Sequence, residues 1–288
     1  ADLSPRDQEN LSHGKVQVDL DKFHKDFVDP LGTLIHDAGF DIEAVGTYLL
    51  AKHAPERNAH ILKMEKEQRA NNIARTEKEI ERLENDIDVD HTVALETQNV
   101  RLEKYKTRPL KFEDTGSGMT DAEAQSVLNT AEREGTKEAI ENIASAVYEM
   151  MDFQRDIMVK SGLLDKDARE DWEENFDFYV PIKGFAAEPK GDSYASQSVS
   201  RGFSVVGKES MKAKGRKTLP VNPLLTAIED VQKKIIRARK NETAQVLSEL
   251  LSKLGDSDSY TRYNNKFRPP KDSDPLTMQD LDFMSRDT

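Results

Sequence analysis

The chain has no cysteine, a single tryptophan and few aromatic residues, which form 7% of its 288 positions. Without cysteine, structural disulfides, thiolate zinc sites, cysteine-ligated iron–sulfur clusters and cysteine nucleophiles are excluded. No apolar run approaches the roughly 20 residues that a transmembrane helix needs, so we expect no membrane span. Apolar residues almost never alternate with polar ones at every second position, which is the pattern of a half-buried strand. Only the short segment from Ser198 to Lys208 is typical of a β-strand.

The chain is rich in charged residues. Charged residues form 33% of it and hydrophobic residues 36%, which is above and below the respective globular averages. We therefore predict an all-α protein: an elongated bundle with long helices, a helical hairpin, an extended aromatic segment and mobile loops. The formal net charge of −12 argues against a globally basic nucleic-acid-binding protein. The N-terminal residues are polar and lack an initiator methionine, so we expect no signal peptide and a fragment or processed product of a longer protein.

The clearest single element is a helix from Asn222 to Leu254, about 50 Å long at roughly 1.5 Å per residue. Asn222 is a good N-cap, Pro223 suits the first helical position, and Gly255 follows the last apolar residue. Its apolar stripe is predicted to consist of Leu225, Ile228, Val231, Ile235, Val246, Leu250 and Leu254. A helix this long and charged is more typical of a scaffold than of an active-site wall.

The N-terminal third is predicted to contain several helices. A first helix runs from Asp19 to Ala38 and is bent or divided by Pro30. Asp41 caps a short helix, and a much longer charged helix begins around Pro55. Its apolar residues recur every seven positions, as in a short coiled-coil seam: Ile73, Ile80 and Ile87, with Leu83 between the last two.

A second helix, from about His91 to Lys106, carries Val93, Val100 and Leu102. We predict that it folds back on the first as an antiparallel hairpin that turns near residues 86–90, because the sequence DIDVD is a poor helix interior. One continuous rod is the alternative.

The central part is predicted to supply the core. Thr120 and Glu123 form a capping box before a helix, and another helix begins at Thr136 with methionines as core filling. A short helix then holds Trp172. Pro181 disfavours helix in the aromatic stretch that follows, so residues 176–185 should be extended across the helical core. The predicted organisation is 1–18 polar lead-in, 19–115 N-terminal helices, 116–185 central core, 186–221 basic loop, 222–255 long helix and 256–288 polar tail.

The only candidate binding residues are five basic side chains in one segment, with Glu209 as the only acidic neighbour: Lys208, Lys212, Lys214, Arg216 and Lys217. The segment is interpreted either as a solvated loop or as an arm that contacts phosphates, since clustered cations release counterions from a polyanion. It contains no aromatic residue on which a base could stack, which weakens the second interpretation.

No residues stand out as catalytic, metal-ligating or cofactor-binding. The six histidines form no HExxH pattern, and we expect them at the surface or at element boundaries. The carboxylates between Asp165 and Asn175 should be solvated, with no burial to raise a pKa. In the stretch from His53 to His60, Pro55 and Glu56 suit a first helical turn. Arg57 and Asn58 are expected to donate hydrogen bonds that lock helix pairs.

Four stretches resemble the helical modules of very large multidomain phage and mobile-element proteins, sometimes called large polyvalent proteins. They are Tyr48–Ile61 with its KHAPERNA octapeptide, Gly116–Ala124, Phe176–Phe185 and the long helix with its Ala238–Asn241 segment. The resemblance implies a connector inside giant proteins that are packaged in phage heads and ejected with the genome, beside helicase, methyltransferase, protease or polymerase domains. It carries over no catalytic residue.

The leading hypothesis is a non-enzymatic segment of such a virion protein, delivered into the host cell. It would contact other virion proteins or domains of a larger parent chain, DNA, or a second copy through the long helices. Outside a virion, a cytoplasmic location is expected. The alternatives are a nucleic-acid-binding accessory domain of a phage polymerase or helicase, and a cell-wall-degrading or other enzyme of unseen type.

Overall fold

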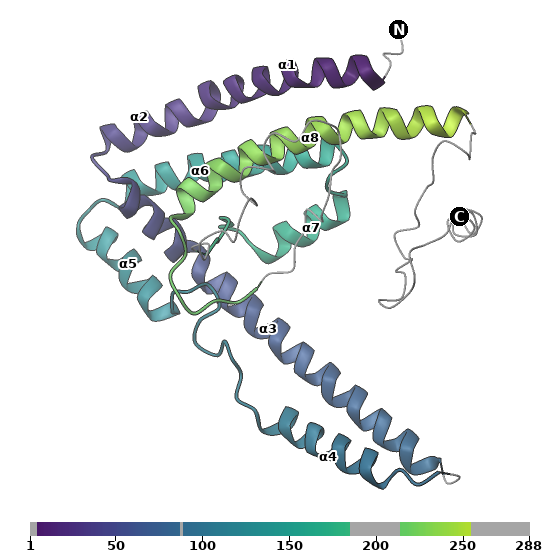
Figure 1. Cartoon of the computed structure of the whole chain (residues 1–288). Helices are drawn as coiled ribbons and strands as arrows, with labels where there is room; N and C mark the ends of the chain where they lie inside the picture. Colours follow the sequence, from purple (N-terminus) through teal and green to yellow (C-terminus); the bar gives the residue numbers. More distant parts are fainter. Residues whose placement is uncertain (1–4, 87–88, 185–213, 255–288) are drawn as a thin grey trace, which may run out of the picture.

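The computed structural model describes residues 5–86, 89–184 and 214–254, and this part of the chain is all-α, as predicted (Figure 1). The elements are α1 (Pro5–Phe23), a π-helical turn η1 (His24–Val28), α2 (Asp29–Asp37), α3 (Ile42–Asn85), α4 (Thr92–Thr107), α5 (Asp121–Arg133), α6 (Lys137–Lys160), α7 (Lys166–Asn175) and α8 (Pro223–Leu254). The described residues include no strand, only an isolated parallel bridge between Ser117 and Arg216. The predicted β-like segment and the polar tail lie outside the described residues.

The first helix is longer than predicted. It begins at Pro5 rather than Asp19, within the segment expected to be a polar lead-in. Pro30 divides it as expected, and the division takes the form of the η1 turn directly before α2. A π turn widens the helix locally, which accommodates a proline ring that would clash with the carbonyl four residues earlier.

Helix α3 differs from the prediction in a second way. Asp41 caps it through the backbone N–H of Ala44, at 2.6 Å, but no new helix begins at Pro55. Instead, α3 continues through Pro55 as one helix of 44 residues. An interior proline costs about 3 kcal/mol in an isolated helix. Here Leu50 and Ala54 beside it are buried against α5, and tertiary packing outweighs the local cost.

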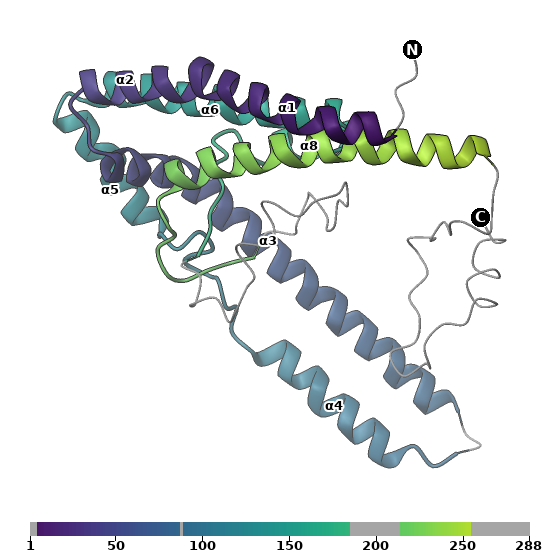
Figure 2. The ribbon, with the colours of Figure 1, turned by 45° about the horizontal axis from the view of Figure 1, so that its top comes forward.

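The body of the molecule is a layer of helices in which α1 and α6 both pack on α8, and α3 crosses beneath them (Figures 1 and 2). The core residues expected on α6 are buried, including Met150 and Met151. Of the stripe predicted on α8, Val231 and Ile235 are buried and Ile228 and Val246 are half-buried, whereas Leu225 is 43% exposed and Leu224 is buried instead. The side chains of Leu250 and Leu254 lie outside the described residues. The helix starts at Pro223, so its buried face follows 224, 227, 231 and 235.

The second half of α3 leaves the body and pairs with α4, which returns antiparallel to it (Figures 1 and 2). The predicted hairpin is thus confirmed, and we call its residues 66–107 the arm. Arg69 anchors the arm at its base by donating to the carbonyls of Tyr105 and Lys106, both at 2.6 Å. Leu83 and Thr76 are buried on the inner side of α3.

The face of α4 that packs on α3 contains only one of the three apolar residues named from the sequence. Val93 and Val100 are 77% and 66% exposed, and α4 has no buried residue. Leu102 is half-buried, as are the other residues that face α3 at heptad spacing: Leu95, Gln98 and Tyr105. The sequence alone does not choose between the two faces, because two apolar series, about 200° apart around one helix, both fit a helical period.

No helix in the described part of the chain has the length and apolar character that crossing a bilayer requires.

Candidate functional site

The candidate site is a junction on α3, at the point where the helix leaves the body. Three consecutive residues, Glu56, Arg57 and Asn58, each hold a different distant segment of the chain against the helix. We call this site the three-way junction. Pro55 and Glu56 do not form a first turn as predicted, because the helix began at Ile42. Glu56 therefore points its carboxylate at another segment rather than at its own helix terminus.

Asn58 holds the glycine-rich loop before α5. Its Oδ1 accepts from the backbone N–H groups of Gly116 and Ser117 at 2.7 and 2.8 Å. Its Nδ2 donates to the Met119 carbonyl at 2.9 Å and to Asp121 Oδ1 at 2.7 Å. Asn58 is 7% exposed, so these contacts are shielded from water. The side chain thus uses both its donor and its acceptor capacity to fix the loop.

Arg57 holds the segment that precedes α8. Its Nη2 donates to the Lys214 carbonyl at 3.3 Å, and the backbone N–H of Arg216 donates to the Gly116 carbonyl at 3.0 Å. A glycine is required where this segment crosses the loop. Gly118 has φ +96°, and a Cβ there would lie 2.2 Å from the Thr218 carbonyl oxygen. Two loops from distant parts of the sequence therefore meet beside Arg57.

Glu56 holds the aromatic segment. Its two carboxylate oxygens accept from the backbone N–H groups of Asp177 and Phe178, at 3.1 and 3.2 Å. The segment is not helical, as the sequence predicted, and its Val180 is fully buried. Tyr179 is held by an edge-to-face contact with Trp172, the two ring centroids lying 4.6 Å apart.

His53 lies beneath this segment with 0% exposure, which corrects the expectation that the histidines are at the surface or at boundaries. Its ring contacts Phe176 and Tyr179 edge-on, at centroid distances of 5.3 and 5.5 Å. Neither ring nitrogen makes a hydrogen bond, although Nδ1 lies 3.6 Å from the Glu56 carboxylate. Burial lowers the pKa of the His53 imidazole, more than the Glu56 carboxylate raises it, so the ring is neutral at pH 7.

Other buried polar atoms along the aromatic segment also lack a hydrogen-bond partner. They are Arg57 Nε, the Tyr148 hydroxyl and Gln154 Oε1. Burial raises the pKa of Tyr148, so its hydroxyl stays protonated. An unpaired buried polar atom costs about 1–3 kcal/mol, and most native structures contain few. With Arg155 Nε and the two ring nitrogens of His53, they make up the buried side-chain polar atoms of the described residues that have no hydrogen-bond partner.

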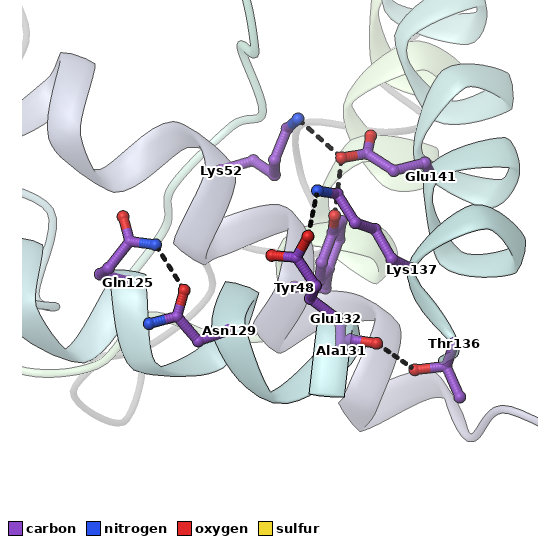
Figure 3. A network of polar contacts seen from close by, with 9 residues as sticks. All are labelled: Tyr48, Lys52, Gln125, Asn129, Ala131, Glu132, Thr136, Lys137 and Glu141. Atoms are coloured by element: carbon purple, nitrogen blue, oxygen red, sulfur yellow. Dashed lines mark hydrogen bonds and ion pairs between the residues drawn. The ribbon is translucent and has the colours of Figure 1, made fainter. Parts of the chain in front are cut away.

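A second polar cluster joins α3 to α6 next to the junction (Figure 3). The Glu141 carboxylate accepts from the Tyr48 hydroxyl at 2.7 Å and from Lys52 Nζ at 2.9 Å. Burial opposes ionisation of Glu141, but these two hydrogen bonds outweigh it and lower its pKa. Lys52 also lies over the Phe178 ring, 4.1 Å from its centroid. The cluster therefore clamps α3, α6 and the aromatic segment together.

The far end of the aromatic segment is tied to α8. Lys183 Nζ donates to Asp230 Oδ1 at 3.0 Å, and Gln154 Nε2 donates to Asp230 Oδ2 at the same distance. The backbone N–H of Val221 donates to the Lys183 carbonyl at 2.9 Å. The segment is thus held by α3 at one end and by α6 and α8 at the other.

Of the predicted basic residues, Lys208 and Lys212 lie outside the described residues. The Arg216 guanidinium donates to the carbonyls of Thr218 and Leu219 at 2.7 and 3.0 Å. Lys214 and Lys217 are exposed beside the junction.

The side chains at the junction form hydrogen bonds that hold distant segments in place. His53 is a nitrogen base beside the Glu56 carboxylate, and Phe176 and Tyr179 cover it, so a substrate would reach it only if the segment moved. The described residues contain no group of histidines and carboxylates that could hold a metal ion. The sequence predicted that Arg57 and Asn58 donate hydrogen bonds, but it did not identify Glu56 and His53 as part of the site. Glu56 was missed because proline followed by glutamate usually signals the start of a helix.

Comparisons with protein-family models, curated proteins and solved structures find no match to this chain.

Proposed function

We propose that this chain is a non-enzymatic helical scaffold within a large phage virion protein that is ejected into the host. It would hold neighbouring domains, other virion proteins or DNA in fixed positions. Its location in a virion rests on the four stretches that resemble modules of large polyvalent phage proteins. Its role as a scaffold rests on the geometry of the described residues.

The observation that carries the scaffold role is the rigid connection between the body and the arm. Helix α3 is part of both, and it passes through the junction without a break. At the base of the arm, the Glu65 carboxylate accepts from the backbone N–H groups of Lys111 and Phe112, at 2.7 and 2.9 Å. Together with the Arg69 contacts, this fixes the chain that returns from α4. A projecting element whose two helices are both tied to the body is suited to spacing partners.

A nucleic-acid-binding accessory role has one observation in its favour. The side chains of Lys214 and Lys217 are exposed beside the junction. We expect weak, salt-sensitive DNA binding that decreases when both are changed to glutamate. If the affinity stays unchanged after this charge reversal, the accessory role is excluded for these residues.

The scaffold role is tested by shortening the arm. Residues 70–104 are replaced by a glycine-rich turn, which keeps Arg69 and its two acceptors. The two hydrophobic clusters of the body contain no residue of the removed part, so the body should melt within a few degrees of the full chain. In the phage or mobile element that encodes the chain, the parent protein with the shortened arm should no longer assemble into particles, whereas the unaltered protein should be found in them.

Two results would contradict the proposal. One is the absence of the unaltered chain from purified particles by mass spectrometry. The other is turnover of a nucleotide, glycan or peptide by the purified chain, with loss of turnover in a variant such as His53→Gln that still folds.

A further inference from the structure

Helix α4 carries an apolar stripe on the side that faces away from α3. Val93 and Val100, 77% and 66% exposed, lie seven residues apart and therefore on one face. Thr97 between them is exposed as well, and Val89, just before the helix, is 58% exposed. The opposite face of α4 already packs on α3. The stripe thus faces away from the rest of the described chain.

The stripe requires an explanation because valine contributes little to an exposed helix. Its branched side chain loses rotamer freedom in a helix, and its apolar surface remains in water. Single exposed apolar residues are normal on any protein surface. The steps of four residues from Val93 to Thr97 and three from Thr97 to Val100 match the spacing of a coiled-coil seam, with threonine in place of an apolar residue at the middle position.

The charges along the arm differ between its two ends. The acidic side chains are at the tip and in the first half of α4, and the basic ones are in the second half and just beyond it. At the tip and in the first half of α4 the exposed acidic residues are Glu81, Glu84, Asp90 and Glu96, with Arg82 as a basic exception. In the second half of α4 and just beyond it, the exposed basic residues are Arg101, Lys104, Lys106 and Arg108. Glu103 is the exception within the basic half. The arm is therefore complementary in charge to an inverted copy of itself.

We infer that α4 is the docking surface for a second copy of this chain, and that the two copies of α4 pack antiparallel. Val93 then lies opposite Val100 of the second copy, and the twofold axis passes between Glu96 and Thr97. The acidic end of each arm lies beside the basic end of the other, whereas a parallel pair would place like charges together. Two arms joined in this way form four helices around a shared seam. The inference does not depend on a virion context.

The first test measures self-association of the full chain by sedimentation equilibrium at several concentrations. We expect a dimer that weakens at high salt, because surface charges are screened. The double variant Val93→Glu, Val100→Glu should raise the dimer Kd about 100-fold, since it places carboxylates in an apolar contact. Val18→Glu is the matched control, because Val18 is 65% exposed on α1 and should leave the Kd unchanged. Far-UV circular dichroism verifies that each variant is helical.

The second test fixes the orientation and uses the absence of cysteine from the chain. A mixture of Val93→Cys and Val100→Cys chains should form a mixed disulfide. Val93→Cys alone should not, because seven residues separate the two copies of position 93 by about 10 Å along the helix, which exceeds disulfide reach. Dimer formation that survives the glutamate variant, a chain that stays monomeric at all concentrations, or Val93→Cys chains that crosslink to themselves as fast as the mixture would each overturn the inference.

Discussion

The body is a layer of packed helices and the arm is a two-helix hairpin, and the two regions are stabilised by different interactions. The body buries large side chains completely, among them Phe23, Leu49 and Met150. The arm buries Thr76 and Leu83, and its helix α4 has no buried residue at all. The body thus owes its stability to the removal of apolar surface from water. The arm relies on hydrogen bonds at its base, donated by Arg69 and accepted by Glu65, and on the thin seam between α3 and α4.

This difference shows why the junction matters. A two-helix hairpin with so little buried surface is marginal by itself. It is positioned because α3 continues into it from a packed core and because the chain leaving α4 is held at Glu65 and Asn58. The orientation of the arm is therefore set by its connections to the body.

The largest expected effect is the difference in the free energy of unfolding between a core truncation in the body and one in the arm. Met150→Ala, at a site with 0% exposure, should lower the free energy of unfolding by about 4 kcal/mol through lost burial and a cavity. Leu83→Ala in the arm, at 6% exposure, should lower it by less than about 1 kcal/mol, because the arm can open locally. Urea unfolding measures the first value. Hydrogen exchange should show faster exchange of arm amides in the second variant. Equal losses would mean that the body and the arm unfold as one unit.

The next effect tests the junction between the two regions. Asn58→Ala removes two donated and two accepted hydrogen bonds and leaves the N–H groups of Gly116 and Ser117 buried without their acceptor. We expect a loss of about 3 kcal/mol in urea unfolding. Asn129→Ala is the control, because Asn129 is exposed on α5 with one hydrogen bond, to Gln125, and should change stability by less than about 0.5 kcal/mol. A similar loss in both variants would show that Asn58 is not a lock.

A smaller effect is the pH dependence that His53 gives to the body. Its pKa is lowered by burial in the folded state and lies near 6.5 when the chain is unfolded. The unfolded chain therefore binds a proton first, so stability is complete above about pH 6.5 and decreases as the pH falls towards the folded pKa, by at most about 1.4 kcal/mol per pH unit. His53→Phe should reduce this slope, whereas His36→Gln, at an exposed position of α2, should leave it unchanged. Urea titrations between pH 7 and 5 measure the slopes. An unchanged slope in the His53 variant would exclude this histidine as the cause.

The smallest effect concerns the capping box of α5, next to the junction. Thr120→Ala removes the cap on the Glu123 N–H, present at 3.2 Å, and should reduce stability by about 1 kcal/mol. Thr130→Ala, within the same helix, serves as the control and should be neutral, because its hydroxyl only bonds the carbonyl four residues earlier. If the Thr120 variant is also neutral in thermal unfolding, the α5 terminus is fixed by Asn58 and not by its cap.

Much of the fold was predictable because it depends on local signals. Asn222 with Pro223, Thr120 with Glu123, and Asp41 are capping residues whose effect is limited to one helical turn, and each begins or caps a helix as expected. The hairpin turn, the extended aromatic segment and the methionines of α6 followed in the same way from turn chemistry and periodicity. The binding role predicted for the basic segment remains a prediction, although Arg216 donates to a carbonyl of its own loop.

The sequence by itself determined where α3, α5, α6 and α8 start, which residues form the core of α6, and that the described part of the chain is all-α. Only the tertiary structure decided that α3 passes through Pro55, that α4 packs by Leu95 and Leu102 rather than by Val93, and that Glu56 and Asn58 bind segments far along the chain. The physical reason is the distance along the chain over which each interaction acts. Caps and turns act within a few residues, whereas the choice between two apolar faces, or between a helix start and an embedded proline, depends on partners that the fold alone brings close.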